Sequence, residues 1–457
     1  MSKLPEEIWR EIFQYLGARD LLNLTRVSRK FREIVNTSQS LAAKLTLCFE
    51  KRKRNSYIGR RRYRKLNVGY IDVSVHYNIL RFVGSDITQL TFSYYNFKLD
   101  SIRQVLMLCS NVKTLRFKEI QHLHGVADVG SNAAVPCYKN CEIEVVQCDP
   151  RIFKILKGCR AKKVHFTCCE FAHRHYFLDF LSFMSMQEDL SHFILEEFFG
   201  PCVGLGLVLF NNDILANTKF RLKSLTMKSN QLSPYGHISS VQFFEQFMNN
   251  QIETLEELEA DQLHDFDFTA YLQQCKKIKN LNVGIDMRLS SKQFLSEVTK
   301  VEVEQPRMNL LRCFPNVTEV KILNTYYDPQ RDIVKWNLLT KCNFIHKLII
   351  EDVSLDDFPS LPSLKCLQLE FYINVDSKIF ARNPQLEEVT FIECRDMRIR
   401  KSKVLKIIVD YLKDLRSLTI VTSSKVDPSA LQYVKQKCPK LKYLKVFKDL
   451  DCEILWN

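Results

Sequence analysis

The chain has 457 residues, of which 46% are hydrophobic, and a formal net charge of +14. This length is too great for one globular core, so it predicts several domains or a repeat array. No basic-then-apolar leader opens the sequence, and the longest apolar run, residues 203–210, is far too short to span a bilayer. We therefore expect a soluble protein of the cytoplasm or nucleus, with no membrane partner and with its 16 cysteines as reduced thiols.

The stretch from Leu4 to Leu41 predicts three short amphipathic helices. Pro5 suits a first helical turn, where a missing N–H costs nothing. Gly17 ends the first helix, Asp20 is expected to cap the second and Ser28 the third. The first helix has apolar residues at helical spacing: Ile8, Ile12, Phe13 and Leu16. About forty residues bury too little surface to be stable alone, so a partner should cover part of this module.

The same stretch resembles an F-box. The family pattern is LPxEI, then IFxxL, then an Asp-Leu pair, then Val-Cys/Ser-Lys/Arg-x-aromatic. The segments of this chain that match it are Leu4–Ile8, Ile12–Leu16, Asp20–Leu21 and Val27–Phe31. Phe31 replaces the commoner Trp, and Ser28 replaces the commoner Cys. The alternative, an ordinary three-helix cap on a repeat domain, has no reason to reproduce this pattern.

The resemblance implies that the module binds the Skp adaptor and, through it, a cullin–RING ubiquitin ligase. The docking residues should divide between contact with the adaptor and packing among the helices, with apolar anchors dominating the binding energy. Leu4 and Pro5, at the exposed start, are expected to be mainly contact residues. The full set is Leu4, Pro5, Ile8, Ile12, Phe13, Leu16, Leu21, Leu24, Val27, Phe31 and Ile34.

Most of the positive charge lies near the N-terminus. Residues 1–66 hold 17 Lys/Arg and 6 Asp/Glu, and the run from Lys51 to Lys65 holds nine Lys/Arg in fifteen residues. Such a run is typical of a nuclear-localisation signal or a polyanion-binding patch, and a solvated loop is an equal alternative. Ala42, Leu45 and Leu47 fit a strand just before it, so we expect the run to form a loop at the rim of the first repeats.

From residue 63 onward, apolar residues recur at the first, fourth and sixth positions of a six-residue pattern. The central residues, from Leu66 to Leu444, are spaced about 25 residues apart, inside the range of leucine-rich repeats. Most repeats lack the Asn or Cys that usually follows the strand, so the array is irregular. The matches begin at residues 63, 87, 112, 143, 161, 190, 222, 255, 278, 298, 317, 345, 364, 386, 415 and 441.

Helical segments separate these strands. They are expected at 100–109, 239–249, 330–341, 403–412 and 427–438. Short strands that alternate with helices predict an α/β fold, here a curved solenoid with a parallel sheet on its concave face. A doubly wound fold is the alternative, but the repeat is short for it and no phosphate-binding glycine loop follows a strand. The expected domains are the F-box at 1–43, a first strand and basic loop at 44–65, and about 16 irregular repeats at 66–457.

An F-box followed by leucine-rich repeats resembles the class of substrate receptors of Skp–cullin–F-box ubiquitin ligases. The resemblance implies that the repeats bind a protein substrate, while other subunits transfer ubiquitin. We therefore expect no catalytic residue and no cofactor. The alternatives are a nucleic-acid or polyanion binder, which the nearly neutral repeats disfavour, and an F-box scaffold that recruits no substrate for degradation.

No metal site is predicted, although cysteines and histidines gather between residues 137 and 175. The CxxC spacing that would pre-form a zinc chelate is missing, and several of these cysteines fit the core of the repeats. The cluster consists of Cys137, Cys141, Cys148, Cys159, Cys168, Cys169, His173 and His175.

Residues that flank the inward apolar positions of each strand should face the concave surface, which such proteins use for binding. We expect the substrate to contact the C-terminal half. Tyr443 and Phe447 are predicted anchors there, unless a cap formed by residues 449–457 covers them. The predicted substrate-binding residues are Arg116, Lys118, Lys163, His165, Gln368, Glu370, Tyr443, Lys445 and Phe447.

Overall fold

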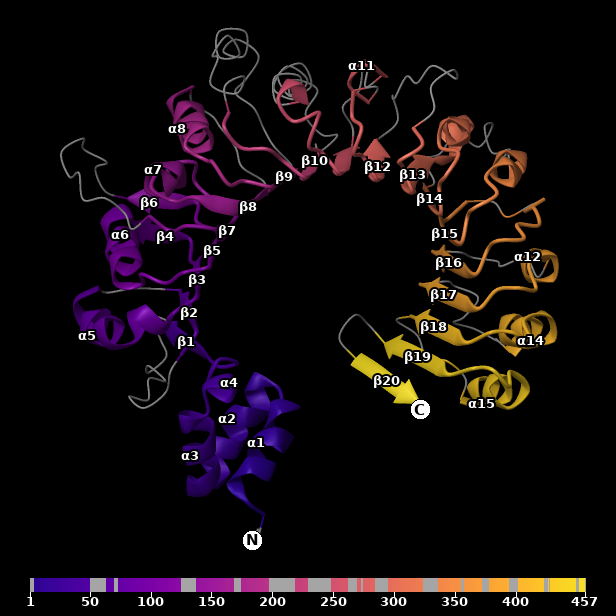
Figure 1. Cartoon of the computed structure of the whole chain (residues 1–457). Helices are drawn as coiled ribbons and strands as arrows, with labels where there is room; N and C mark the ends of the chain where they lie inside the picture. Colours follow the sequence, from indigo (N-terminus) through magenta and orange to yellow (C-terminus); the bar gives the residue numbers. More distant parts are fainter. Residues whose placement is uncertain are drawn as a thin grey trace. The chain divides into compact units, whose positions relative to one another are not determined.

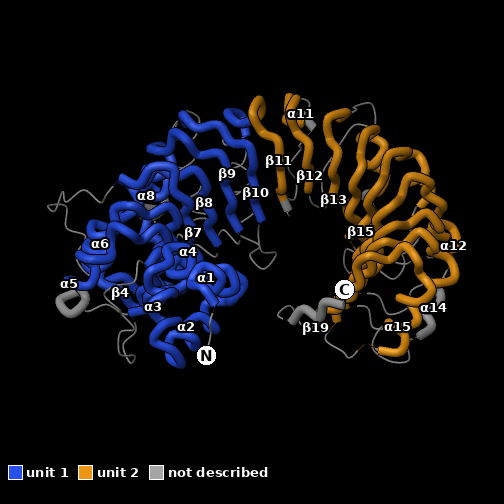
Figure 2. The backbone as a smooth tube through the Cα atoms, turned by 60° about the horizontal axis from the view of Figure 1, so that its bottom comes forward, with its two compact units in different colours: residues 1–251 blue, residues 252–457 orange. Residues whose placement is uncertain are grey.

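In the computed structural model, the chain forms two compact units, residues 1–251 and 252–457 (Figure 2). The predicted basic run from 51 to 62 and most of the predicted helix at 239–249 lie outside the described residues. Within the part that the structure describes, no helix is long and apolar enough to cross a membrane. The described residues are 4–49, 63–69, 73–124, 137–167, 174–196, 218–228, 248–261, 269–272, 274–283, 295–323, 336–353, 355, 357–371, 378–393, 402–422, 426, 428–448 and 452–456.

The N-terminal module has the three predicted helices and one further short helix. They are α1 (Glu6–Gln14), α2 (Ala18–Val27), α3 (Arg29–Thr37) and α4 (Gln39–Ala42). Ser28 caps α3 as predicted, since its Oγ accepts a hydrogen bond of 3.4 Å from the N–H of Phe31. The predicted cap at Asp20 is wrong. Gly17 holds that position, and Asp20 lies in the first turn of α2, where its carboxylate still favours the positive helix end.

Unit 1 continues with a parallel sheet that has helices on one face (Figure 1). Each main strand pairs in parallel with the next one along the chain. A separate two-stranded ladder joins β4 (Asn96–Lys98) to β6 (His122–His124). The main strands are β1 (Thr46–Phe49), β2 (Lys65–Val68), β3 (Gln89–Ser93), β5 (Thr114–Lys118), β7 (Cys141–Val146), β8 (Ala161–Thr167), β9 (His192–Glu196) and β10 (Ser224–Lys228). The helices are α5 (Val73–Val83), η1 (Gly84–Asp86), α6 (Leu99–Leu108), α7 (Ile152–Leu156) and α8 (Arg174–Ser185).

Unit 2 repeats the same plan. Its parallel strands are β11 (Glu257–Asp261), β12 (Asn280–Val283), β13 (Lys300–Glu304), β14 (Glu319–Leu323), β15 (Lys347–Glu351), β16 (Cys366–Glu370), β17 (Glu388–Ile392), β18 (Ser417–Val421) and β19 (Tyr443–Lys448). The last strand, β20 (Cys452–Trp456), pairs antiparallel with β19. The helices are α11 (Thr269–Leu272), η2 (Gln305–Cys313), η3 (Trp336–Lys341), α12 (Lys378–Arg382), α14 (Ser402–Tyr411) and α15 (Pro428–Lys437). The part of the predicted helix 330–341 that is described is therefore a 3-10 helix.

The strand register follows the predicted pattern except in one repeat. The match at 143–148 makes Val146 the central residue, but Ile143 is the residue that pairs with Leu115 and with Val164. With Ile143 as the central residue, the first and normally apolar position of the pattern is Asn140, so the pattern matches only with Val146 as its centre. Because strand side chains alternate, only the phase of Ile143 and Val145 points into the core, where both are buried.

Buried amides satisfy backbone groups where a helix turns into the next strand. Gln187 accepts a hydrogen bond of 2.8 Å from the N–H of Ala161 and donates to the carbonyl of Cys159 at 3.1 Å. Gln251 accepts a bond of 2.7 Å from the N–H of Leu222. Asn383 likewise accepts one of 2.8 Å from Leu361. These amides stand at helix ends, before the strand, whereas the sequence pattern predicted such a residue after the strand.

Candidate docking surfaces

Helix α1 and its lead-in residue carry two apolar faces. Leu4, Ile8, Ile12 and Tyr15 follow one another at helical spacing and are 44%, 40%, 41% and 91% exposed. The opposite face is packed, because Phe13 is buried against Phe31 with ring centroids 5.2 Å apart. Monomeric proteins rarely leave an apolar stripe of this kind in water without a function. We call these four exposed residues the α1 stripe.

The predicted adaptor-binding residues fall into two groups by exposure. Leu4, Pro5, Ile8, Ile12 and Val27 are exposed. The remainder hold the helices together: Phe13, Leu21 and Ile34 are buried, and Leu16, Leu24 and Phe31 are half-buried. Sequence reasoning missed exposed Tyr15, although its position eleven residues after Leu4 continues the same helical face. It also missed exposed Leu22.

Basic side chains hold the C-terminal ends of the first two helices. Lys44 donates from Nζ to the carbonyl of Leu16 at 3.1 Å and also to that of Gln14. Arg32 donates from Nε to the carbonyl of Thr25 at 2.8 Å. Cations stabilise the negative end of a helix. Lys44 lies just before β1, so this contact also joins α1 to the start of the sheet.

The comparisons with known proteins agree with this geometry at the N-terminus. A model of the F-box-like family matches residues 1–48, which cover the four helices and most of β1. Downstream, parallel strands pair with the central residues of neighbouring repeats opposite one another, such as Leu90 with Leu115 and Leu367 with Val389. Residues 1–48 therefore match an F-box-like domain, and a series of paired parallel strands follows it.

Solved structures resemble this chain only distantly. The Rad7 and Elc1 complex of yeast matches at 12% identity and a TM-score of 0.35, with 91% of this chain and 88% of that chain covered. A leucine-rich-repeat protein of Leptospira interrogans matches at 13% and 0.29, with 93% of each chain covered. A leucine-rich-repeat-containing protein of Legionella pneumophila matches at 10% and 0.30, covering 79% and 92%. No curated protein matches the chain.

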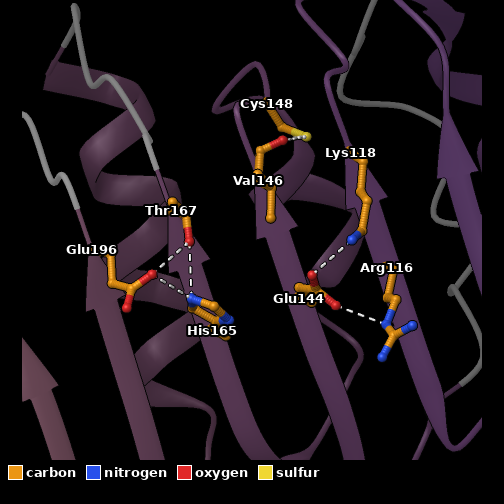
Figure 3. Close-up of polar contacts among 8 residues, drawn as sticks. All are labelled: Arg116, Lys118, Glu144, Val146, Cys148, His165, Thr167 and Glu196. Carbon is orange, nitrogen blue, oxygen red and sulfur yellow. Dashed lines mark hydrogen bonds and ion pairs between the residues drawn. The ribbon is translucent and has the colours of Figure 1, made fainter. Parts of the chain in front are cut away.

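The exposed strand face of unit 1 carries ion pairs between neighbouring repeats (Figure 3). Arg116 Nε lies 2.7 Å from Glu144 Oε2, and Lys118 Nζ lies 3.0 Å from Glu144 Oε1. One carboxylate on β7 thus faces two predicted substrate-binding cations on β5. Glu144 could not be inferred from the sequence pattern, because the repeat at 143–148 was placed out of phase.

A second polar group lies on β8 and β9. His165 Nε2 is 3.0 Å from Glu196 Oε2 and 2.9 Å from Thr167 Oγ1 (Figure 3). Lys228 Nζ lies 3.6 Å from the other carboxylate oxygen of Glu196. Burial alone raises the pKa of the Glu196 carboxyl, but the hydrogen bond and charge of His165, with Lys228 and Thr167, bring it below its ordinary value. The hydroxyl and the carboxylate both meet the same ring nitrogen, which is not the arrangement of a catalytic triad.

Of the predicted substrate-binding residues in unit 1, Lys163 is the one that stays exposed without an ion pair to a described carboxylate. It lies on β8, where its Cα pairs with those of Glu142 and His192 on the neighbouring strands. Lys163 stands at the edge where the strands begin. Arg116, Lys118 and His165 lie farther along their strands.

The predicted substrate-binding residues of unit 2 lie on β16 and β19. Gln368 donates to Glu370 on the same strand. Tyr443 is 57% exposed, while Lys445 and Phe447 are half-buried. The backbone of β20 pairs with that of β19, so the tail covers the edge of the last parallel strand. Tyr443 itself remains accessible beside that edge.

Several cysteines of the 137–175 cluster are core residues. Burial raises the pKa of the Cys141 and Cys148 thiols to about 12. A zinc ligand must be a thiolate, which this burial opposes. Among the described residues, no group of three or more His, Cys, Asp or Glu could hold a metal ion. Cys168, Cys169 and His173 lie outside the described residues.

Proposed function

We propose that this chain is the substrate-recognition subunit of a Skp–cullin–F-box type ubiquitin ligase. In this proposal, the F-box-like domain binds the Skp adaptor, and the repeats hold a protein substrate for ubiquitination. The α1 stripe is the observation that carries it, because its residues are exposed while the opposite face of the same helix is packed. The chain would work in the cytoplasm or nucleus, where its partners act.

Co-purification of the full chain with the Skp adaptor tests this proposal. The variant Leu4→Ala, Pro5→Ala, Ile8→Ala removes exposed contacts and should reduce adaptor binding about 30-fold or more, the equivalent of about 2 kcal/mol. Its melting temperature should change little because these side chains are not core residues. Phe82→Ala is the matched control, since Phe82 is 77% exposed but lies on α5. Unchanged binding by the triple variant would end the proposal.

No catalytic residue is assigned to this chain, because in the proposed complex other subunits carry out ubiquitin transfer. The polyanion-binding alternative loses support on the strand face. There, Glu144 compensates the charge of Arg116 and Lys118, and Glu196 that of Lys228.

A further inference from the structure

We infer that the edge of unit 1 at which its strands begin binds an acidic segment of a protein partner. Six exposed basic residues form this edge, which we call the lysine edge: Lys113, Lys139, Lys162, Lys163, Arg221 and Lys223. This inference gives the chemical class of the substrate. It rests on the proposed function in one respect, that the acidic segment belongs to the substrate.

Backbone contacts place these residues along one line. The carbonyl of Lys113 accepts a bond of 2.8 Å from the N–H of Glu142, at the start of β7. The carbonyl of Lys162 accepts one of 3.0 Å from Ser191, whose own carbonyl accepts one of 2.8 Å from the N–H of Lys223. The lysines therefore recur across β5 to β10, with neighbouring strands about 4.8 Å apart. The edge spans about 20 Å, the length of about six residues of extended chain.

The charges of the lysine edge are not neutralised by described carboxylates. None of the six side chains forms an ion pair within the described part of the chain. Among the described residues, two exposed carboxylates without an ion pair lie between these basic residues, Glu142 and Asp189. The nearby Lys219 already pairs with Glu188 at 3.5 Å. Exposed like charges on adjacent strands repel each other, so this edge is less stable than a paired one.

The strand-start edge of unit 2 shows the paired arrangement. Lys279 lies 3.5 Å from Glu256, and Glu387 lies 2.9 Å from Lys365 and 3.2 Å from Arg416. Lys440 pairs with Asp414. The same repeat position therefore accepts a carboxylate from the neighbouring repeat. In unit 1 the six basic residues of the lysine edge form no such ion pair within the described residues, and a partner can supply the carboxylates.

The composition of the edge favours a protein over a nucleic acid. Five of the six residues are lysines, whereas the bidentate contacts that bind phosphate best come from arginine. Glu142 and Asp189 would repel a continuous phosphate backbone, but a peptide can place its carboxylates between them. The described residues of this edge also include no exposed aromatic ring on which bases could stack.

The test uses the full chain and fluorescence anisotropy with labelled decaglutamate as the probe at low salt, where surface charges are least screened. Decaglutamine and 20-nucleotide single- and double-stranded DNA are the comparison ligands. The test variant is Lys162→Gln, Lys163→Gln, Lys223→Gln. The matched control is Lys279→Gln, Lys365→Gln, Lys440→Gln, which removes the same net charge from paired positions in unit 2.

We expect decaglutamate to bind and decaglutamine not to bind. The test variant should weaken decaglutamate binding about tenfold, because it removes three exposed positive charges from the edge, and the control variant should weaken it less than about twofold. Adaptor binding should be unchanged in both variants, so that loss of the proposed function remains distinguishable. Equal losses in the two variants, absence of decaglutamate binding, or tighter DNA binding that depends on the same lysines would each overturn the inference.

Discussion

The rings of Trp9 and Phe31 lie with their centroids 4.8 Å apart, which joins α1 to α3 across the interior of the F-box-like domain. Phe13 completes the cluster, 5.6 Å from Trp9 and 5.2 Å from Phe31. This cluster fixes the rotation of α1. The α1 stripe can face a partner because the other side of the helix is held in this way.

Core and contact residues of α1 should separate in a pair of single substitutions. Phe13→Ala should lower the free energy of unfolding of the domain by about 3–5 kcal/mol, because Phe13 is 1% exposed. Ile12→Ala should change it by less than about 1 kcal/mol while weakening adaptor binding. Urea unfolding followed by circular dichroism, together with an adaptor-binding isotherm, measures both effects. Equal destabilisation by the two substitutions would contradict the division of α1 into two faces.

Lys44→Met should lower stability by about 1 kcal/mol, because the cation that caps the carbonyl end of α1 is removed while the apolar stem is kept. Lys30→Met provides the control, since its bond to the carbonyl of Leu4 is long, at 3.4 Å, and exposed. The difference in urea midpoint between the two variants is the measurement. Equal urea midpoints for the two variants would show that the Lys44 contact does not stabilise the C-terminal end of α1.

Asn383→Ala should destabilise unit 2 by about 2–3 kcal/mol. The substitution leaves the buried N–H of Leu361 and the carbonyls of Ile379 and Pro359 without their amide partner. Gln385→Ala is the milder comparison, because among the described residues this side chain donates to a single carbonyl, that of Leu361 at 2.7 Å. Thermal melting followed by circular dichroism measures both effects. A larger loss of stability in Gln385→Ala than in Asn383→Ala would contradict this prediction.

Stability should also depend on pH through Glu196. The pKa of this carboxyl is lower in the folded chain than its ordinary value of 4.5, so the ionised form stabilises the fold above that pH. This contribution is lost as the pH falls through the folded pKa. The stability difference between the wild type and Glu196→Gln should therefore shrink between about pH 6 and about pH 3. A difference that stays constant over this range would show that the ion pairs with His165 and Lys228 contribute nothing.

Much of this fold could be predicted because its signals are local. The spacing of apolar residues such as Leu115 and Phe117 marks a strand, and the cap at Ser28 marks a helix start. The error at residues 143–148 arose because the six-residue pattern needs an apolar first position, which Asn140 does not provide in the correct phase. Glu142 and Glu144, which alternate with Ile143 and Val145, mark the outward face of this strand, and the pairing confirms it.

The candidate surfaces were less predictable than the fold. Alternation along β5 places Arg116 and Lys118 on the exposed face, but it does not show that Glu144 on β7 faces both. These contacts depend on how β5 pairs with β7, because Glu144 is 28 positions from Arg116 and 26 positions from Lys118 in the sequence. The lysine edge is likewise visible only when the starts of five strands are brought into one line.

Hydrogen exchange of the full chain, with and without the Skp adaptor, tests the central claim most directly. Backbone amides of residues 6–37 should become protected on binding, most of all around the α1 stripe, while residues 252–457 should exchange as in the free chain. Protection confined to the repeats, or none at saturating adaptor, would contradict it.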